Sequence, residues 1–247
     1  MNRSNKVWNA MYWCVLLAAV VCTVVRLLGL AHSLPTAYLK DDFNHYYATA
    51  VLLSTGQIPY GIPLSGLQLG AAFKWNEFTP MATNPPVLAM LTEPLAFMAP
   101  NASWMIWESL VIVSLMLCFG LMLRELQPKL SGKTIVLFCL MATSSAAAAR
   151  LVEHGQVQSI ILLSVILGWI AARRNSWLAS AALWGFAAAI KIYAWPLLLI
   201  LLRKDLKTFF FGVCSAGVVS VLPVFLYGTG VYTGFAASAM PLLQDAF

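Results

Sequence analysis

Charged residues are scarce in this chain of 247 residues, and that scarcity excludes most soluble proteins. Only 10% of the residues are charged and 61% are hydrophobic, whereas soluble domains carry about 25% charged and about 45–50% apolar residues. The mean hydropathy is +0.80. Apolar runs recur as far as the C-terminus, so a signal peptide of about 15–30 residues does not account for them. The composition therefore predicts an integral membrane protein.

Features typical of metal sites, disulfide frameworks and nucleic-acid binding are also lacking. The five cysteines lie scattered within apolar runs without CxxC spacing, so we expect them to pack as small apolar residues. No cluster with metal-ligand spacing is present, and we expect neither a metal nor another cofactor. The net charge of +6 would suit nucleic acid. However, the basic residues lie at the ends of apolar segments, where such residues set membrane topology. We therefore expect a lipid bilayer as partner and no nucleic acid.

The long apolar segments predict an all-α polytopic membrane protein, because a spanning helix needs about 20 largely apolar residues. The candidate spans are residues 7–30, 103–123, 134–151, 155–172, 177–202 and 208–227. The apolar segment 85–98 is too short to cross and suits an interfacial or re-entrant position. We expect residues 31–102 to form a long outer loop that contains a surface helix at 42–54.

Basic residues predict the orientation, since cytoplasmic loops carry an excess of Lys and Arg. Four groups mark the cytoplasmic side: Arg3 and Lys6; Arg124, Lys129 and Lys133; Arg173 and Arg174; Arg203, Lys204 and Lys207. The N-terminus is then cytoplasmic. The last two groups flank residues 177–202, so a single crossing there would violate the rule. We predict a broken, re-entrant helix near Pro196, because proline lacks an amide donor and disfavours helix at the residue before it. Such a break is tolerated where it lines a cavity.

This topology places three polar stretches on the outer side. They are the sequence KDDFNHYY, which holds Asp41 and Asp42, the turn Glu153-His154-Gly155-Gln156, and Lys191 within an apolar run. Each has an alternative explanation: a helix cap, an ordinary polar turn or a snorkelling lysine. An ionisable group at membrane depth costs about 2.5–3.5 kcal/mol, which favours a functional role.

Together these three stretches suit group transfer from a phosphate-bearing donor. A carboxylate can accept a proton from a hydroxyl, while Lys and His can hold a phosphate. The aromatic rings of this region, among them Tyr46 and Tyr47, could stack on sugars or form an interfacial belt. We expect the belt for most of them.

The chain resembles glycosyltransferase family 87 in four stretches that follow the family's order over about residues 40–205. They are Asp42-Phe43-x-x-Tyr46-Tyr47-x-x-Ala50 with Gly56-x-x-Pro59-Tyr60, Asn84-Pro85-Pro86 with Glu93-Pro94-Leu95, His154-Gly155-Gln156, and Ala189-Ile190-Lys191-Ile192-Tyr193. Two departures stand out. Asn84 occupies a position where the family usually has an aromatic residue, and Ala194-Trp195 separates Tyr193 from Pro196.

The resemblance implies a membrane-embedded GT-C fold and a hexosyltransferase of the cell envelope. The donor would be polyprenyl-phosphate mannose, the acceptor a lipid or glycan hydroxyl on the outer face, and the transfer would invert the sugar. The family pattern makes Asp42 the catalytic base. We expect the donor phosphate and sugar to be bound by Lys191, His154, Gln156, Tyr46, Tyr47, Asn84 and Asp41. Family members are longer, so we expect residues 1–247 to form one GT-C-like domain that is incomplete at its C-terminus.

Two alternative functions remain open at this point. The first is an inactive or partial GT-C subunit, suggested by the short C-terminal part. The second is a lipid or small-solute transporter, since broken helices with charges at the membrane midplane also mark transporters. A transporter predicts interrupted segments in both halves of the chain, and the sequence has one clear interruption, near Pro196.

Overall fold

The computed structural model describes residues 42–62, 84–143 and 145–244, together with five isolated positions in the first apolar segment. Those five are Trp13, Leu17, Val21, Val24 and Val25. The rest of the expected span at 7–30 and the candidate residue Asp41 lie outside the described residues. Every regular element within them is a helix, which confirms the predicted all-α class.

In the described segments from residue 42 onward, three short helices precede the long helix α4 (Pro100–Leu126). Helix α2 (Asp42–Ser54) has the bounds predicted for the surface helix, and its first residue is an acid, which the helix dipole favours. Helices α3 (Pro86–Thr92) and η2 (Glu93–Phe97) follow, each with a proline in the first turn. Together they are apolar but shorter than a span, as predicted for 85–98. Helix α2 packs against both of them and is buried on most sides, so it is enclosed by protein.

Two helices of the described part are long and apolar enough to cross a membrane. They are α4 (Pro100–Leu126, 27 residues) and α10 (Leu206–Tyr227, 22 residues). The segment predicted as a single span at 134–151 is instead divided into α5 (Gly132–Thr143) and α6 (Ala146–Glu153), which are bent by 68°. Ser145 explains where α6 begins, because its side chain accepts a hydrogen bond from the Ala148 amide at 3.2 Å and so caps the new helix. If the bent pair counts as one span, the described residues hold three.

The predicted break near Pro196 is present, and it begins five residues earlier than the proline. Helix α7 (Gln158–Arg173) is followed by α8 (Trp177–Ile190), which ends where Lys191 adopts an extended backbone with φ −140° and ψ 128°. Three short helices come next: η3 (Ile192–Ala194), α9 (Pro196–Ile200) and η4 (Leu201–Arg203). Pro196 is the first residue of α9, where its missing amide has no helical partner to lose.

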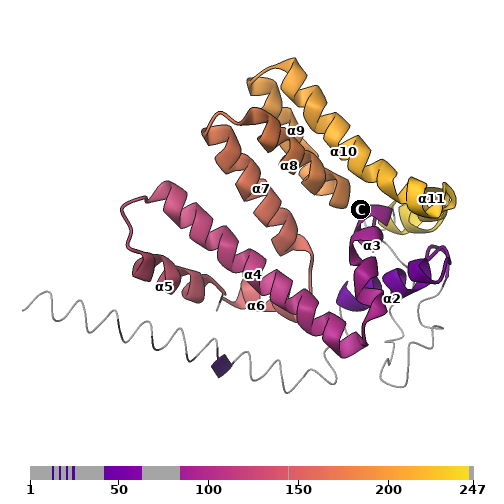
Figure 1. The fold of residues 1–247 in the computed structure, drawn as a ribbon, viewed down its shortest axis with the longest axis horizontal. Coiled ribbons are helices and arrows are strands. Elements are labelled where there is room, and N and C mark those ends of the chain that lie inside the picture. The colour runs from indigo at the N-terminus through magenta and orange to yellow at the C-terminus, as the bar shows by residue number, and fades with distance from the viewer. Residues whose placement is uncertain are drawn as a thin grey trace, which may run out of the picture.

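The longer helices lie side by side in one layer, with α8 between α7 and α10 and with α4 beyond α7 (Figure 1). Helices α2, α3 and α11 (Gly230–Gln244) gather at one end of this layer (Figure 1). The main core cluster joins residues of α2, α3, α4, α7, α8 and α10. Each long helix therefore has one end at this gathering and the other end away from it.

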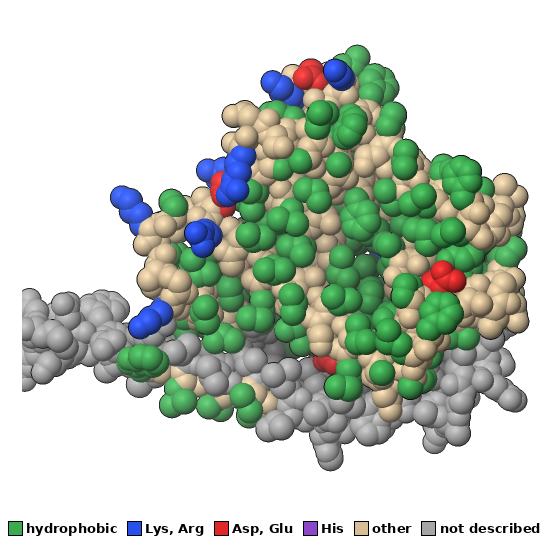
Figure 2. Space-filling view, in the orientation of Figure 1, with side chains coloured by type: hydrophobic (Ala, Val, Ile, Leu, Met, Phe, Trp, Pro, Cys, Tyr) green, Lys and Arg blue, Asp and Glu red, His purple; other side chains and the backbone are tan. Residues whose placement is uncertain are grey.

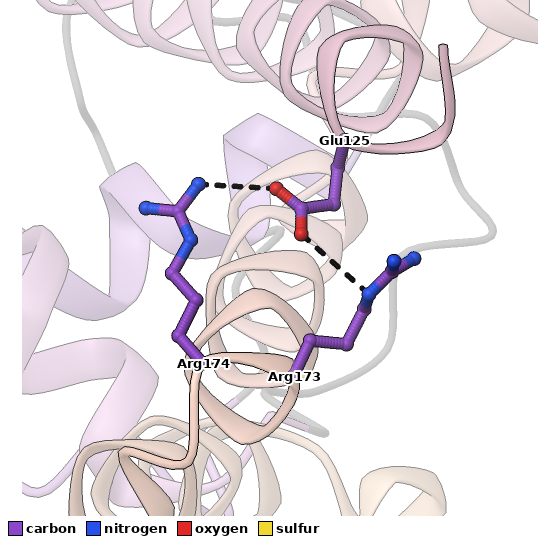
Figure 3. Close-up of polar contacts among 3 residues, drawn as sticks. All are labelled: Glu125, Arg173 and Arg174. Atoms are coloured by element: carbon purple, nitrogen blue, oxygen red, sulfur yellow. Dashed lines mark hydrogen bonds and ion pairs between the residues drawn. The ribbon is translucent and has the colours of Figure 1, made fainter. Parts of the chain in front are cut away.

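Basic residues occupy the far ends of the same helices. Lys and Arg side chains line the upper-left edge of the molecule (Figure 2). At this edge Glu125 at the end of α4 pairs with Arg174 at 3.0 Å and with Arg173 at 3.5 Å (Figure 3). Three of the four basic groups predicted to be cytoplasmic lie in the described residues. They flank the ends of α4, α7, α8 and α10 that lie away from α2, α3 and α11. The orientation of the layer in a membrane remains a prediction.

A close contact between α8 and α10 leads to a stability prediction. A Cβ atom at Gly185 would lie 2.6 Å from the Gly212 carbonyl oxygen and 2.8 Å from Ser215 Cβ. Backbone atoms cannot move aside as a flexible side chain can, so we expect Gly185→Ala to destabilise the fold by about 1–3 kcal/mol. The readout is the Tm of the detergent-solubilised protein. Gly217→Ala on α10 is the control, since that position is open and should keep or raise the Tm. Equal Tm values for the two variants would contradict the close packing.

Candidate functional site

Aromatic packing holds the first turns of α2 in place. Phe43 lies edge-on to Trp104 of α4 at 5.0 Å between ring centroids, and Tyr46 packs in the same way on Trp107 at 5.5 Å. The Tyr47 hydroxyl donates to the Met98 carbonyl oxygen at 2.9 Å. These rings are buried and fix the helix that begins at Asp42. The expected roles of Tyr46 and Tyr47 in donor binding remain predictions.

The His-Gly-Gln turn lies directly against this aromatic group. Gly155 has φ +60°, and its carbonyl oxygen accepts a hydrogen bond from Trp107 Nε1 at 2.6 Å. A Cβ atom at Gly155 would lie 2.8 Å from Trp104 Cζ3 and 2.9 Å from Phe43 Cβ. The turn between α6 and α7 therefore contacts the residue that follows Asp42. His154 and Gln156 flank this contact point.

The Gly155 contact gives a second stability prediction. We expect Gly155→Ala to destabilise the fold by about 2–4 kcal/mol, because it adds a steric clash to the cost of a positive φ. Gly56 is a matched control, since it has φ +76° but open space around its Cβ position. Gly56→Ala should cost only the conformational part, about 1–2 kcal/mol. Unfolding of both variants followed by tryptophan fluorescence measures the difference. If Gly155→Ala costs no more than Gly56→Ala, the turn does not pack as described.

Lys191 reaches across the fold to Asn84. Its Nζ atom donates a hydrogen bond to Asn84 Oδ1 at 2.9 Å, although the two residues are 107 positions apart. The Asn84 carbonyl oxygen in turn accepts a hydrogen bond from the Tyr60 hydroxyl at 2.8 Å. The extended backbone of Lys191 at the end of α8 directs the ammonium to this partner. Asn84 and Lys191, predicted separately as donor-binding residues, thus form one polar pair.

Asp42 lies close enough to three other side chains for its charge to influence them. They are Lys191, His45 and Tyr46. Burial lowers the pKa of His45 below its usual value of 6.5, and the charge of Asp42 partly opposes this shift. The carboxylate and the ammonium thus lie within electrostatic reach of one another at one end of the layer. Six polar residues of this end are partly exposed: Asp42, His45, Asn84, His154, Gln156 and Lys191.

The family model of glycosyltransferase family 87 matches residues 82–246, more than half of the chain. The chain belongs to glycosyltransferase family 87. No curated protein and no solved structure matches it significantly. The matched range holds Asn84, the turn at Gly155 and Lys191, and it extends past the expected resemblance as far as α11. Asp42 and α2 precede the matched range, so their assignment depends on the contacts described above.

This family 87 glycosyltransferase contains supporting contacts that sequence reasoning missed. Glu93 accepts a hydrogen bond from the Tyr227 hydroxyl, which joins η2 to the end of α10. Helix α11 packs on the segment after α2, where Tyr60 meets Phe235 at 5.3 Å between ring centroids. These contacts position the segment that presents Asn84 to Lys191. The one available signal was Glu93 itself, because an acid in an apolar run needs a polar partner.

The polar side chains at this end are of types that can bind a phosphate. Among the residues that the structure describes, no three His, Cys, Asp or Glu side chains come together as metal ligands. Lys191 supplies a fixed positive charge. His154 and Gln156 are of the side-chain types that donate hydrogen bonds to phosphate oxygens. An ammonium close to a carboxylate is the arrangement needed to bind a charged leaving group and accept a proton in one reaction.

Proposed function

We propose that this glycosyltransferase moves a sugar, mannose, from a polyprenyl-phosphate donor to an acceptor hydroxyl, with inversion at the anomeric carbon. The observation that carries the proposal is the hydrogen bond from Lys191 Nζ to Asn84 Oδ1, which fixes an ammonium at the same end of the layer as Asp42 at the start of α2. Family membership supports the sugar transfer itself. The donor class and the acceptor are proposed from the resemblance to the family, and a carboxylate and an ammonium at one end of the layer are compatible with them.

Asp42 acts as the base in this mechanism. Its carboxylate takes the proton of the acceptor hydroxyl while the acceptor oxygen attacks the anomeric carbon. The bond between that carbon and the phosphate oxygen breaks, and the lipid phosphate leaves with the electron pair. One displacement inverts the anomeric carbon. A single carboxylate suffices, because phosphate is a good leaving group, unlike the alcohols for which glycoside hydrolases use a carboxylate pair.

Lys191 stabilises the charge that develops on the leaving phosphate. A preorganised ammonium does this without reorganisation at the moment of reaction. Asn84 Oδ1 holds the Lys191 ammonium at 2.9 Å before the donor arrives, and His154 and Gln156 supply further hydrogen bonds. Beside Lys191, the side chains of Ile192 and Tyr193 are 80% and 56% exposed. We assign this apolar surface to the first isoprene units of the donor.

The site is proposed to face the outer side of an inner (plasma) membrane. The site lies at the ends of α4, α7, α8 and α10 that are opposite to the basic groups. Basic loops favour the cytoplasmic side, so the opposite ends face outward. Transfer on that face suits a lipid-linked donor, which reaches the site from within the bilayer.

The test is a transfer assay on the purified chain in liposomes. Polyprenyl-phosphate [14C]mannose and GDP-[14C]mannose are supplied separately with a membrane extract as acceptor source. We expect transfer from the lipid-linked donor alone, with release of polyprenyl phosphate. Transfer from the nucleotide sugar would contradict the donor class. A folded chain without transfer would favour the inactive or partial subunit, and donor movement between leaflets without transfer would favour the transporter.

A further inference from the structure

His45 shares the open side of α2 with Asp42. Residues three apart on a helix are neighbours on its surface, with about 5–6 Å between their Cβ atoms. Between residues 42 and 50, Asp42 and His45 are partly exposed while every other side chain is buried. The packing of α2 therefore leaves one narrow strip of the helix open. The proposed base and an imidazole occupy that strip together.

The His45 ring has a nitrogen free to accept a proton. Its Nδ1 atom is buried and has no hydrogen-bond partner in the part of the chain that the structure describes. Buried polar atoms are nearly always paired, so a buried ring nitrogen without a partner needs an explanation. In a neutral imidazole one nitrogen carries a hydrogen and the other is an acceptor. In the tautomer that carries its hydrogen on Nε2, Nδ1 can therefore accept a proton from a neighbouring group.

Within the part of the chain that the structure describes, Asp42 is the charged group whose field reaches His45. Of the helices packed on α2, α3 contains no ionisable side chain, and Glu93 of η2 is bonded to Tyr227. Helix α4 presents Trp104 and Trp107 to α2, and its buried acid Glu108 is the residue after them. Lys191 acts on Asp42 and is bonded to Asn84. The charge of His45 is therefore coupled to that of Asp42.

We propose that His45 is a proton relay, which takes from Asp42 the proton removed from the acceptor and passes it to outer water. This inference rests on the proposed function. The proton moves from the acceptor oxygen to the Asp42 carboxylate, and the carboxyl O–H bond then breaks as an N–H bond forms on the His45 ring. Release of that proton from the partly exposed ring restores the neutral imidazole. His45 touches no reacting atom of the sugar and acts through Asp42.

The direction of this transfer follows from acid strengths. A carboxylic acid is ordinarily a stronger acid than an imidazolium, so a proton passes from a carboxyl group to an imidazole ring downhill. Burial lowers the pKa of His45. The ring is therefore neutral at pH 7 and ready to accept. As the pH falls through the His45 pKa, the imidazole takes a proton from the solvent. It can then no longer accept the proton from Asp42, and kcat falls.

The test is the pH profile of kcat for wild type and His45→Gln. For the wild type we expect kcat to fall as the pH drops through the lowered pKa of His45. For His45→Gln we expect a kcat at pH 7.5 that is up to about 100-fold lower, the low end of what a positioned proton-transfer group contributes. Its profile should be flat across the range in which the wild type falls. Thr49→Val is the matched control. It removes the hydroxyl that bonds the His45 carbonyl oxygen one turn along α2 and leaves the ring intact, so the wild-type profile should persist.

A wild-type pH profile in a folded His45→Gln protein would overturn the relay. If His45→Gln lowers the Tm, His45→Phe keeps a ring of similar size and carries the same test. Imidazole in the outer buffer should restore part of the rate of His45→Ala, and absence of rescue counts against the relay. Asp42→Asn separates the two proposals. If it is inactive while His45→Gln keeps the wild-type profile, the relay alone fails. If Asp42→Asn is fully active, the proposed base fails as well.

Discussion

Asp42→Asn is expected to slow sugar transfer by about 100- to 10,000-fold, the range in which a positioned general base contributes. The amide has nearly the shape of the carboxylate but cannot take the proton from the hydroxyl group that receives the sugar. Helix α2 should still form, because asparagine is tolerated at a helix start and the aromatic packing of Phe43 and Tyr46 is unchanged. The measurement is the initial rate with a saturating lipid-linked donor, together with donor binding, which should remain.

Asp205→Asn is the matched control for this substitution. Asp205 lies at the basic end of the layer and caps α10, where its Oδ1 accepts a hydrogen bond from the Thr208 amide at 2.7 Å. Asparagine caps helices about as well as aspartate, so activity and Tm should both persist. If Asp42→Asn and Asp205→Asn are equally active, Asp42 is not the base.

Lys191→Met is expected to have the second largest effect. Methionine keeps much of the length of the side chain but removes the charge and leaves Asn84 Oδ1 without its donor. Loss of one preorganised group facing a developing charge costs about 100- to 1,000-fold in kcat. The affinity for the donor should fall as well, because the ground-state phosphate is already charged. Rate and binding should be measured separately, the latter with polyprenyl phosphate as a competitor.

Lys207→Met tests whether any lysine in the chain would have the same effect. Lys207 lies in the first turn of α10, at the basic end and away from Asn84. We expect its removal to leave kcat and donor affinity unchanged. If Lys191→Met binds polyprenyl phosphate as tightly as Lys207→Met does, the phosphate role of Lys191 is wrong.

The helices and the break could be predicted from local features of the sequence. Apolar runs of sufficient length predicted α4 and α10, and the bounds of α2 were predicted as 42–54. The break before Pro196 was predicted from a conflict between two basic groups and one apolar segment, which a single crossing cannot resolve. These features depend on composition and on nearby residues, so the sequence alone contains the information.

The bend between α5 and α6 could not be predicted in the same way. Residues 134–151 are apolar enough for one span, and the Ser145 cap is a weak signal when it is read without its partner. The packing of Gly155 against Trp104 and Phe43 depends on three segments that are far apart in the sequence. Such contacts arise from the tertiary arrangement, and no local pattern records them.

For the candidate site residues, the sequence predicted only that they lie on the same side of the membrane. Topology placed Asp42, the turn at His154 and Lys191 together, but it could not pair Lys191 with Asn84. That pair depends on how the end of α8 meets the start of α3. The open side of α2, where His45 joins Asp42, became visible only when the burial of the surrounding side chains was known.

A structure of the chain with bound polyprenyl phosphate tests the central claim most directly. The claim is that Asp42, Lys191 and the turn at His154 surround one junction between phosphate and sugar. The account predicts a phosphate oxygen within about 3 Å of Lys191 Nζ, as expected for a charge-assisted hydrogen bond, with Asp42 facing the position of the anomeric carbon. A phosphate held by Arg173 and Arg174 at the opposite end of the layer would contradict it.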